Sequence, residues 1–569
     1  MKSRIVSILL LVLVLASCAN RGIGPQGGPK DSIPPVPLKA EPVNGAVNFN
    51  GKRIEVTFNE YLQLDNVSQH LMMSPPQQKP PEVKARGKKL VIQFVDSLRD
   101  STTYTLDFGD AVCDYNEKVP YHNYSFAFST GPTIDTLETY GRVYDASNND
   151  PRGGIMVGIH SDFSDTAFTK HPFLRIAKTD SAGFFRIGNM RAGKYRLYAV
   201  DDVSRDYRLT LGEAHAFADE FVTTGDTTAL YLFKPEQRKL YLLRTLREQR
   251  HLVKVLFSSP PDSLPQFRCL NDTVHFHTQF SAHADTVQLW LTDSSSISVD
   301  SLFFEARFRR TDSLFRLEWA TDTLRAIWRT PRMTAKALEA EHRKNRNRRL
   351  ELKTNASNAF ELNDTLKLRC TTPIKDINLD KIHIVECVDS LRNPVPFEIA
   401  PHDTLPMQLV FLATMQPGKA YELKLDSGSL HDVYDVTHVA GTYPLQLKTP
   451  EDYAKLLVRL NPFVLNARIQ LLNNRDEVIR EMPADLEGTL FDFLKADTYY
   501  MRFYIDANGD RKWTPGCWEE RRQPEEVFYN PNSIQTKSNW DFEEEWDYTL
   551  TPKESSKPRE LIGRSSSKK

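Results

Sequence analysis

The sequence lacks the motifs that mark most enzyme active sites. It contains no HExxH, no GxSxG, no Walker A motif and no glycine-rich dinucleotide loop. The sequence also lacks an excess of charge of either sign, because it has 73 Lys and Arg residues and 74 Asp and Glu residues, for a formal net charge of -1. No overall field therefore favours nucleic acid. We predict a protein that is not an enzyme and has no nucleic-acid partner.

Closely spaced cysteines are absent as well. The six cysteines are far apart, without the CxxC pairs that a zinc site or a disulfide framework needs. Cys370 and Cys387 are the one pair that we expect to be bridged if any pair is. The composition therefore excludes a small disulfide-stapled fold.

Only the N-terminus carries a long apolar run. Lys2 and Arg4 precede the run from Ile5 to Leu15, which is too short to span a bilayer core of about 30 Å. The residues LASC at its end resemble the lipobox that the lipoprotein signal peptidase cuts. This resemblance implies that Cys18 becomes the acylated N-terminus, anchored by chains that each contribute about 0.8 kcal/mol per buried CH₂. The alternative is an ordinary signal peptide that ends near a cysteine.

After Cys18 the chain is too long for one core, since domains average about 150 residues. Short segments that alternate apolar and polar residues, separated by turns, predict antiparallel strands. The predicted fold class is all-β, with tandem Ig-like and transthyretin-like β-sandwich domains on an N-terminal lipid tether. The predicted order is a signal peptide (1–17), a Gly- and Pro-rich flexible tether (18–32), an Ig-like domain (33–131), a second sandwich (133–235), an unassigned β domain with a basic connector (236–350), a second Ig-like repeat (351–449), a C-terminal sandwich (450–550) and a disordered tail (551–569).

Two segments resemble known families. IPPVPLKAEPVNGAVNFNGKRIEVTFNEYLQLDN, followed by DSLRDSTTYTLDFGDAVCDYNE and FAFSTG, resembles the bacterial Ig-like domain of the SbsA type. TDSAGFFRIGNMRAGKYRLYAV resembles the transthyretin-like domains called carboxypeptidase-regulatory-like. Both resemblances imply β-sandwich modules, and neither supplies catalytic residues.

One loop has the beginning of a calcium-binding pattern. Asp506, Asn508 and Asp510 place oxygen side chains at alternate positions, and Glu519 is a later carboxylate that could complete the shell of a hard cation. The pattern is incomplete, because the twelfth position is Cys517. A polar β-turn is the other interpretation, and it is the one we favour. We therefore predict no cofactor, with calcium at this loop as the one alternative.

The triplet Asp, then Ser or Thr, then Ala, Ile, Leu, Met or Val is frequent. Average usage predicts about two or three copies in this length. The copies begin at Asp31, Asp96, Asp135, Asp165, Asp180, Asp262, Asp272, Asp285, Asp300, Asp312, Asp322, Asp364, Asp389 and Asp403. The triplet resembles the O-glycosylation sequon of exported Bacteroides-group proteins, which implies modification at Thr273, Thr286, Ser301 and Thr365. The structural alternative is that Asp favours a turn and the apolar residue begins a strand.

These observations favour a non-catalytic cell-envelope lipoprotein at the outer membrane, facing the periplasm or the cell surface. It resembles Ig-like-domain lipoproteins of the Bacteroides group, and would act as a multi-domain spacer, binding or structural protein. Its expected partners are the membrane, through the anchor, and a polysaccharide or an envelope protein. One alternative is a glycan- or peptidoglycan-binding lipoprotein, for which the aromatic candidates are Trp513, Trp518, Trp540 and Trp546. The other is an enzyme with accessory β domains, for which only 236–350 leaves room.

Overall fold

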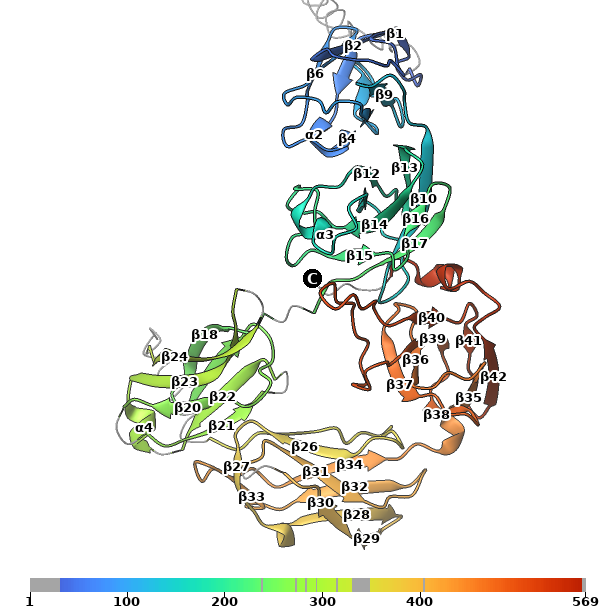
Figure 1. Cartoon of the computed structure of the whole chain (residues 1–569). Helices are drawn as coiled ribbons and strands as arrows, with labels where there is room; N and C mark the ends of the chain where they lie inside the picture. Colours follow the sequence, from blue (N-terminus) through green and yellow to red (C-terminus); the bar gives the residue numbers. More distant parts are fainter. Residues whose placement is uncertain are drawn as a thin grey trace, which may run out of the picture. The chain divides into compact units, whose positions relative to one another are not determined.

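The protein is described by a computed structural model that covers residues 31–236, 239–271, 274–281, 284–292, 294–313, 316–329, 348–402 and 405–564. These residues confirm the predicted fold class, because they form tandem β-sandwiches of mainly antiparallel strands with only short helices (Figure 1). The chain divides into two compact units, unit 1 (Met1–Tyr144 and Pro151–Leu232) and unit 2 (Asp145–Asp150 and Phe233–Lys569). Among the described residues, no helix has the length and apolar character needed to cross a membrane.

Sandwich 1 belongs to unit 1. Alternate residues of its strands fill one apolar core. In β2, for example, Ile54, Val56 and Phe58 are buried and the residues between them are not. Its sheets have the orders β1-β2-β6-β5, β4-β7-β9 and β3-β8. Its elements are β1 (Pro37–Glu41), β2 (Arg53–Phe58), β3 (Leu62–Leu64), α2 (Val67–His70), β4 (Met72–Ser74), β5 (Glu82–Arg86), β6 (Lys89–Gln93), β7 (Thr103–Asp107), β8 (Val112–Asp114) and β9 (Ser125–Ser129).

Sandwich 2 completes unit 1. A three-stranded sheet, β13-β10-β17, faces a larger sheet of order β12-β11-β14-β15, in which β16 also pairs with β14. Its elements are β10 (Leu137–Asp145), β11 (Met156–His160), α3 (Ala167–Lys170), β12 (Arg175–Lys178), β13 (Phe184–Met190), β14 (Lys194–Val200), β15 (His215–Phe217), β16 (Val222–Thr223) and β17 (Thr227–Leu232). Its likeness to transthyretin-like domains stays a prediction.

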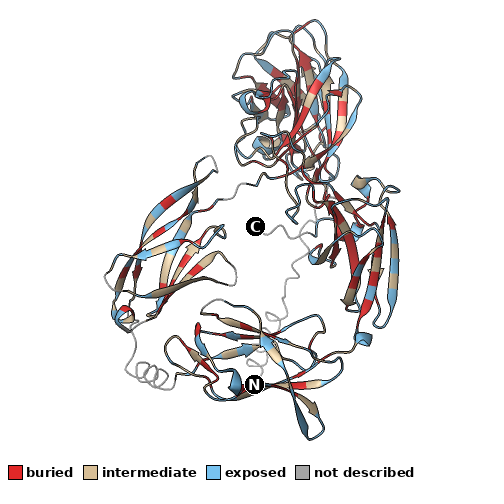
Figure 2. Cartoon of the chain, turned by 60° about the horizontal axis from the view of Figure 1, so that its bottom comes forward, coloured by how far each residue is buried: buried red, intermediate tan, exposed pale blue. Residues whose placement is uncertain are grey.

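Sandwich 3 opens the main part of unit 2. Its two sheets, β18-β19-β22-β21 and β20-β23-β24, enclose a separate apolar core (Figure 2). Its elements are β18 (Leu242–Gln249), β19 (Leu252–Phe257), β20 (Gln266–Cys269), β21 (Phe276–Phe280), β22 (Thr286–Leu291), α4 (Ser294–Ser298), β23 (Ser301–Thr311) and β24 (Leu317–Ile327). Most of the predicted basic connector lies outside the described residues.

Sandwich 4 repeats the strand order of sandwich 1. Its sheets run β25-β26-β31-β30, β27-β33 and β29-β28-β32-β34, so the two orders agree once the added edge strand β29 is set aside. Its elements are β25 (Leu352–Thr354), β26 (Leu366–Cys370), β27 (Ile374–Ile377), η1 (Leu379–Lys381), β28 (Ile382–Val388), β29 (Leu391–Val395), β30 (Phe397–Ile399), β31 (Gln408–Ala413), β32 (Ala420–Leu425), β33 (Leu430–Asp432) and β34 (Gly441–Gln446). Cys370 and Cys387 are both free thiols, so the disulfide prediction is wrong.

Sandwich 5 repeats the strand order of sandwich 2. Its sheets run β38-β35-β42 and β37-β36-β39-β40, and β41 pairs with β39 as β16 pairs with β14. Its elements are β35 (Ala454–Asn461), β36 (Ala467–Leu472), β37 (Val478–Pro483), β38 (Thr489–Leu494), β39 (Thr498–Ile505), β40 (Val527–Tyr529), β41 (Ile534–Gln535) and β42 (Asp541–Asp547), and η2 (Pro450–Asp452) precedes them. The internal repeats are thus present as strand order, while the exact domain limits stay predictions.

The tail is not disordered as predicted, up to residue 564. It forms the short helices η3 (Lys553–Ser555) and η4 (Arg559–Leu561). Leu561 is fully buried in a core shared with Tyr504 and Tyr529. The tail was predicted to be disordered because its composition is of low complexity. The side chains against which it packs are far away in sequence, so no local pattern indicated the contact. Residues 565–569 lie outside the described part.

Candidate functional site

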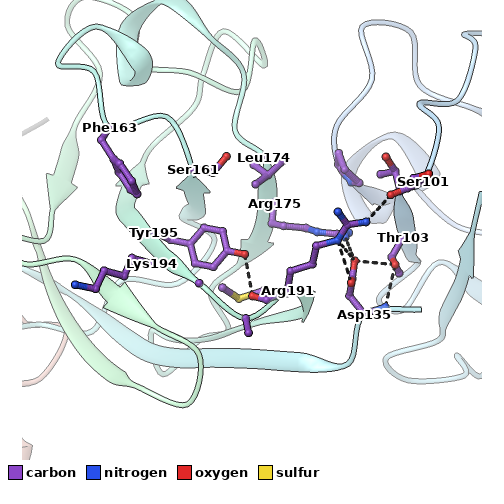
Figure 3. Close-up of a pocket in the computed structure, with 15 residues that line it drawn as sticks. Ser101, Thr103, Asp135, Ser161, Phe163, Leu174, Arg175, Arg191, Lys194 and Tyr195 are labelled. Carbon is purple, nitrogen blue, oxygen red and sulfur yellow. Dashed lines mark hydrogen bonds and ion pairs between the residues drawn. The ribbon is translucent and has the colours of Figure 1, made fainter. Parts of the chain in front are cut away.

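A cavity of about 450 Å³ lies between sandwiches 1 and 2 within unit 1 (Figure 3). Sandwich 1 supplies Ser101 to Thr103, at the start of β7, and sandwich 2 supplies Arg175 from β12 and the turn between β13 and β14 that carries Arg191. Asp135 lies in the connection from β9 to β10. Its carboxylate therefore contacts Thr103 of sandwich 1 as well as Arg191 of sandwich 2.

The Asp135 carboxylate is the centre of this site. Its Oδ2 accepts a hydrogen bond from Thr103 Oγ1 at 2.9 Å, and its own backbone N–H donates to Thr103 Oγ1 at 3.0 Å. Arg191 Nε donates to Oδ1 at 3.2 Å, and Arg175 Nη2 lies 3.7 Å from Oδ2. One carboxylate therefore faces two guanidinium groups, which leaves the wall of the cavity positively charged.

Arg175 is the buried cation of the site. Its side chain is 7% exposed, and Nη1 donates to the carbonyl oxygen of Ser74 at 3.2 Å. Burial lowers the pKa of Arg175 to about 10, although the Asp135 carboxylate acts in the opposite direction. The side chain stays charged at neutral pH, so it remains bound to Asp135 and Ser74 together.

Further hydrogen bonds connect the same two sandwiches. Arg191 Nη2 donates to the Ser101 carbonyl at 2.5 Å, and Asn189 Nδ2 donates to the Asp135 carbonyl at 2.7 Å. Thr105 Oγ1 donates to Asn189 Oδ1 at 2.9 Å. We call these residues, with Asp135, Thr103 and Arg175, the Asp135 cluster. The cavity lining carries the carboxylate of Asp135 and the cations Arg175, Arg191 and Lys194, so its charge suits a fixed junction or the holding of an anion.

A second charged junction connects sandwiches 4 and 5 within unit 2. Glu361 Oε1 lies 2.8 Å from Lys448 Nζ and 2.9 Å from Lys495 Nζ, and Oε2 accepts from the Tyr453 hydroxyl at 2.7 Å. Partial burial acts to raise the pKa of Glu361, but these three hydrogen bonds lower it to about 2. We call these four residues the Glu361 cluster.

The predicted calcium residues form a loop braced by carboxylates. Asp506 accepts from the backbone N–H groups of Gly509 and Arg511, at 2.8 and 3.0 Å, and Asp510 accepts from Lys512 N. The second carboxylate that braces this loop is Glu525, which accepts from Ala507 N and Thr514 N, while a role for Glu519 in a calcium shell stays a prediction. Among the described residues, no group of three or more His, Cys, Asp or Glu side chains is arranged to hold a metal. Calcium binding at Asp506, Asn508 and Asp510 stays a prediction.

Sandwich 2 braces the corresponding loop in the same way. Asp202 accepts from Asp206 N and Tyr207 N, at 3.2 and 3.0 Å. Glu213 accepts from Ser204 N and Thr210 N, both at 3.0 Å. The sequence did not reveal this pairing, because the Glu follows its Asp at a different distance in the two sandwiches.

The other predicted residues lie as follows. Cys18 and Thr273 are outside the described residues. Thr286 and Ser301 are half-buried at the first positions of β22 and β23, and Thr365 is exposed just before β26. The middle hydroxyls of the remaining described triplets are all exposed, namely Ser32, Ser97, Thr136, Thr166, Ser181, Ser263, Ser313, Thr323 and Ser390. The Asp residues also brace turns, as Asp180 does for Ala182 N, so the glycosylation and structural interpretations both stay open.

The C-terminal tryptophans do not gather into a surface site. Trp518 and Trp546 are buried, and Trp513 Nε1 donates to the Glu525 carbonyl, which leaves Trp540 as the exposed one of the four. Trp319 of sandwich 3 is exposed as well, and it was not among the residues predicted from the sequence. The period-two alternation of β24 could have predicted its position on an outer face.

Comparison with known proteins decides the class of the first domain. Residues 31–130 match the family model described as the bacterial Ig-like domain. Sandwich 1 is a bacterial Ig-like domain. Among curated proteins nothing matches the chain.

Several solved structures are similar to parts of this chain. Domains 1–6 of the surface layer protein SbsC are 10% identical, with 84% of this chain and 62% of that chain covered and a TM-score of 0.14. BcpA, the major pilin subunit of Bacillus cereus, is 9% identical, with 73% and 100% covered and a TM-score of 0.13. An L,D-transpeptidase from Mycobacterium smegmatis is 13% identical, with 35% and 90% covered and a TM-score of 0.13. The fold assignment rests on the strand pairing above, and these likenesses assign no activity to this chain.

Proposed function

We propose that this protein is a non-catalytic lipoprotein of the outer membrane, anchored through Cys18, whose sandwiches act together as a structural spacer and binding array. The observation that carries the proposal is the Asp135 cluster, in which a buried arginine and a shared carboxylate connect consecutive sandwiches. A spacer needs such fixed junctions, because flexible linkers would let each module move independently. The bacterial Ig-like domain at residues 31–130 is consistent with this role.

The anchor is tested by exchanging the lipidated residue. Wild-type protein should partition into the detergent phase, and Cys18→Ala protein should stay in the aqueous phase, because several acyl chains provide stable membrane attachment. Equal partitioning of the two proteins would exclude the anchor. Protease treatment of intact cells then separates the two locations. Degradation on whole cells indicates the cell surface, and protection until the outer membrane is broken indicates the periplasm.

We also propose that exposed hydroxyls of the Asp-Ser/Thr triplets other than Thr323, with Thr365 as the test case, carry O-linked sugars, as the presence of such hydroxyls on four of the five sandwiches would allow. Intact-mass analysis of native protein should show increments of hexose size that diminish in Thr365→Ala, whose hydroxyl is exposed. Thr372→Ala is the matched control, because Thr372 is buried and lies outside any triplet. An unmodified mass would leave the turn-forming role of the triplets as the explanation.

A further inference from the structure

The sheet β20-β23-β24 of sandwich 3 has one face in the core and one face in solvent (Figure 2). On β23, Leu302, Phe304, Ala306 and Phe308 are at most 2% exposed and pack into the core. The residues between them point outward because side chains alternate along a strand. The outer face is thus defined by a different set of side chains from those that stabilise the sandwich.

Two aromatic rings lie on this outer face. Trp319 is 58% exposed and Phe303 is 36% exposed. Phe303 is paired with Arg325 across the hairpin, and Trp319 is paired with Arg309. Because β23 rises about 3.4 Å per residue, the two ring positions are about 20 Å apart along the strands. The face is therefore long enough for an extended polymer.

The same face has an excess of arginine. Arg268, Arg307, Arg309 and Arg325 share it with one acidic residue, Glu305, which lies 3.0 Å from Arg268. At the end of the face, Asp262 lies 3.8 Å from Arg309.

Arg307 and Arg325 instead lie over the aromatic rings. Arg307 Cζ is 5.0 Å from the centroid of Trp319, and Arg325 Cζ is 5.7 Å from that of Phe303. Among the described residues, neither arginine has a carboxylate within ion-pair distance. Two charges on this face are therefore available to an acidic ligand.

We propose that this face, which we call the Trp319 face, binds a linear polysaccharide that carries carboxylate groups. The C–H faces of sugar rings are apolar and pack against exposed aromatic rings, which removes apolar surface from water. Guanidinium groups bind carboxylates through paired hydrogen bonds. Thr321 and Thr323, exposed and short, separate the two rings and leave both accessible.

Sandwich 5 provides a matched control within the same chain. Trp540 is 57% exposed, and Lys537 Nζ lies 5.3 Å from its ring, so both tryptophans are exposed and accompanied by a cation. The adjoining strand β42 has the sequence DFEEEWD. Its carboxylates would repel an acidic polymer, whereas the arginines of the Trp319 face would attract it.

The experiment measures the affinity of purified Cys18→Ala protein, with the intact mass of an unmodified chain, for polygalacturonate. Trp319→Ala should weaken binding by about tenfold or more, and Trp540→Ala should leave it unchanged. Arg325→Gln should weaken binding and reduce its dependence on salt. Since Arg325 is exposed, this variant tests the face even if Trp319→Ala fails to fold.

The proposal would be overturned by the absence of polygalacturonate binding by the parent protein, by equal binding of neutral dextran, or by an equal loss in Trp319→Ala and Trp540→Ala. Tighter binding of dextran sulfate, DNA or an acidic protein would overturn it too, because simple charge attraction or another class of partner would then explain the face. The measurement does not involve the lipid, so its failure would leave the proposed anchor and spacer role untouched.

Discussion

Sandwiches 1 and 2 form a pair that sandwiches 4 and 5 repeat, with the same strand orders and a charged junction in each pair. Both junctions place one carboxylate against two cations, Asp135 against Arg175 and Arg191, and Glu361 against Lys448 and Lys495. The residues themselves are not equivalent. Asp135 lies in the connection between its sandwiches, whereas Glu361 belongs to sandwich 4.

The burial of the cations differs between the two junctions. One cation of each junction is exposed, Arg191 at 62% and Lys495 at 65%, but the other is buried further in the first junction, where Arg175 is 7% exposed against 25% for Lys448. Buried charges are costly to leave without a partner, and exposed pairs contribute little. A common arrangement of charge thus buries one cation almost completely in the first pair, whereas neither cation of the second pair is buried to that extent.

Sandwich 5 also differs from sandwich 2 in having a C-terminal tail. We expect a substitution in this tail to cause the largest loss of stability. Lys557 Nζ, on a side chain 2% exposed, lies 2.9 Å from Asp476 and 2.7 Å from Asp150, both in unit 2. Lys557→Ala leaves the buried Asp476 carboxylate without this cation. We expect the free energy of unfolding, measured by urea denaturation, to fall by about 3–5 kcal/mol.

The neighbouring Lys553→Ala is the control for that variant. The Lys553 side chain is 13% exposed and pairs with Glu526, whose side chain is 57% exposed, so the variant leaves no buried carboxylate without a partner and its loss should be smaller than that of Lys557→Ala. Limited proteolysis should cut the tail of Lys557→Ala first. If the two variants are equally stable, the tail does not depend on the buried ion pair.

The braced loops of sandwiches 2 and 5 give the second comparison. Asp202→Ala and Asp506→Ala each remove a carboxylate that accepts two backbone N–H groups, and each should lower the free energy of unfolding by about 2 kcal/mol. Thermal unfolding with calcium and with chelator tests the alternative role of the loop in sandwich 5. A bracing role predicts the same transition in both solutions. A calcium-dependent rise that Asp506→Ala abolishes and Asp202→Ala retains would establish a metal site.

The sequence predicted the sandwiches better than it predicted their junctions and loops. Alternation such as that of RIEVTF records local burial, so strands and repeated strand orders could be inferred from it. Arg175 and Asp135 are 40 positions apart, and their meeting depends on how two sandwiches pack, which no local pattern records. The calcium-like residues illustrate the same limit, because Asp506 fits both a metal loop and a turn braced with Glu525.

A substitution in the Glu361 cluster should cause the smallest loss of stability. The dependence of that loss on pH is the way to detect it. Since the pKa of Glu361 is lowered to about 2 from its ordinary 4.5, its contribution is fully present above pH 4.5 and is lost as the pH falls toward 2. Allowing for solvent screening at this partly exposed side chain, Glu361→Gln should cost about 1 kcal/mol at pH 7. The stability difference between wild type and Glu361→Gln, measured by urea unfolding, should shrink from pH 5 to pH 2. Asp452→Asn, which alters a carboxylate of the adjoining η2 helix outside the cluster, serves as the control. A difference that stays constant over this range would show that Glu361 acts through packing and not through its charge.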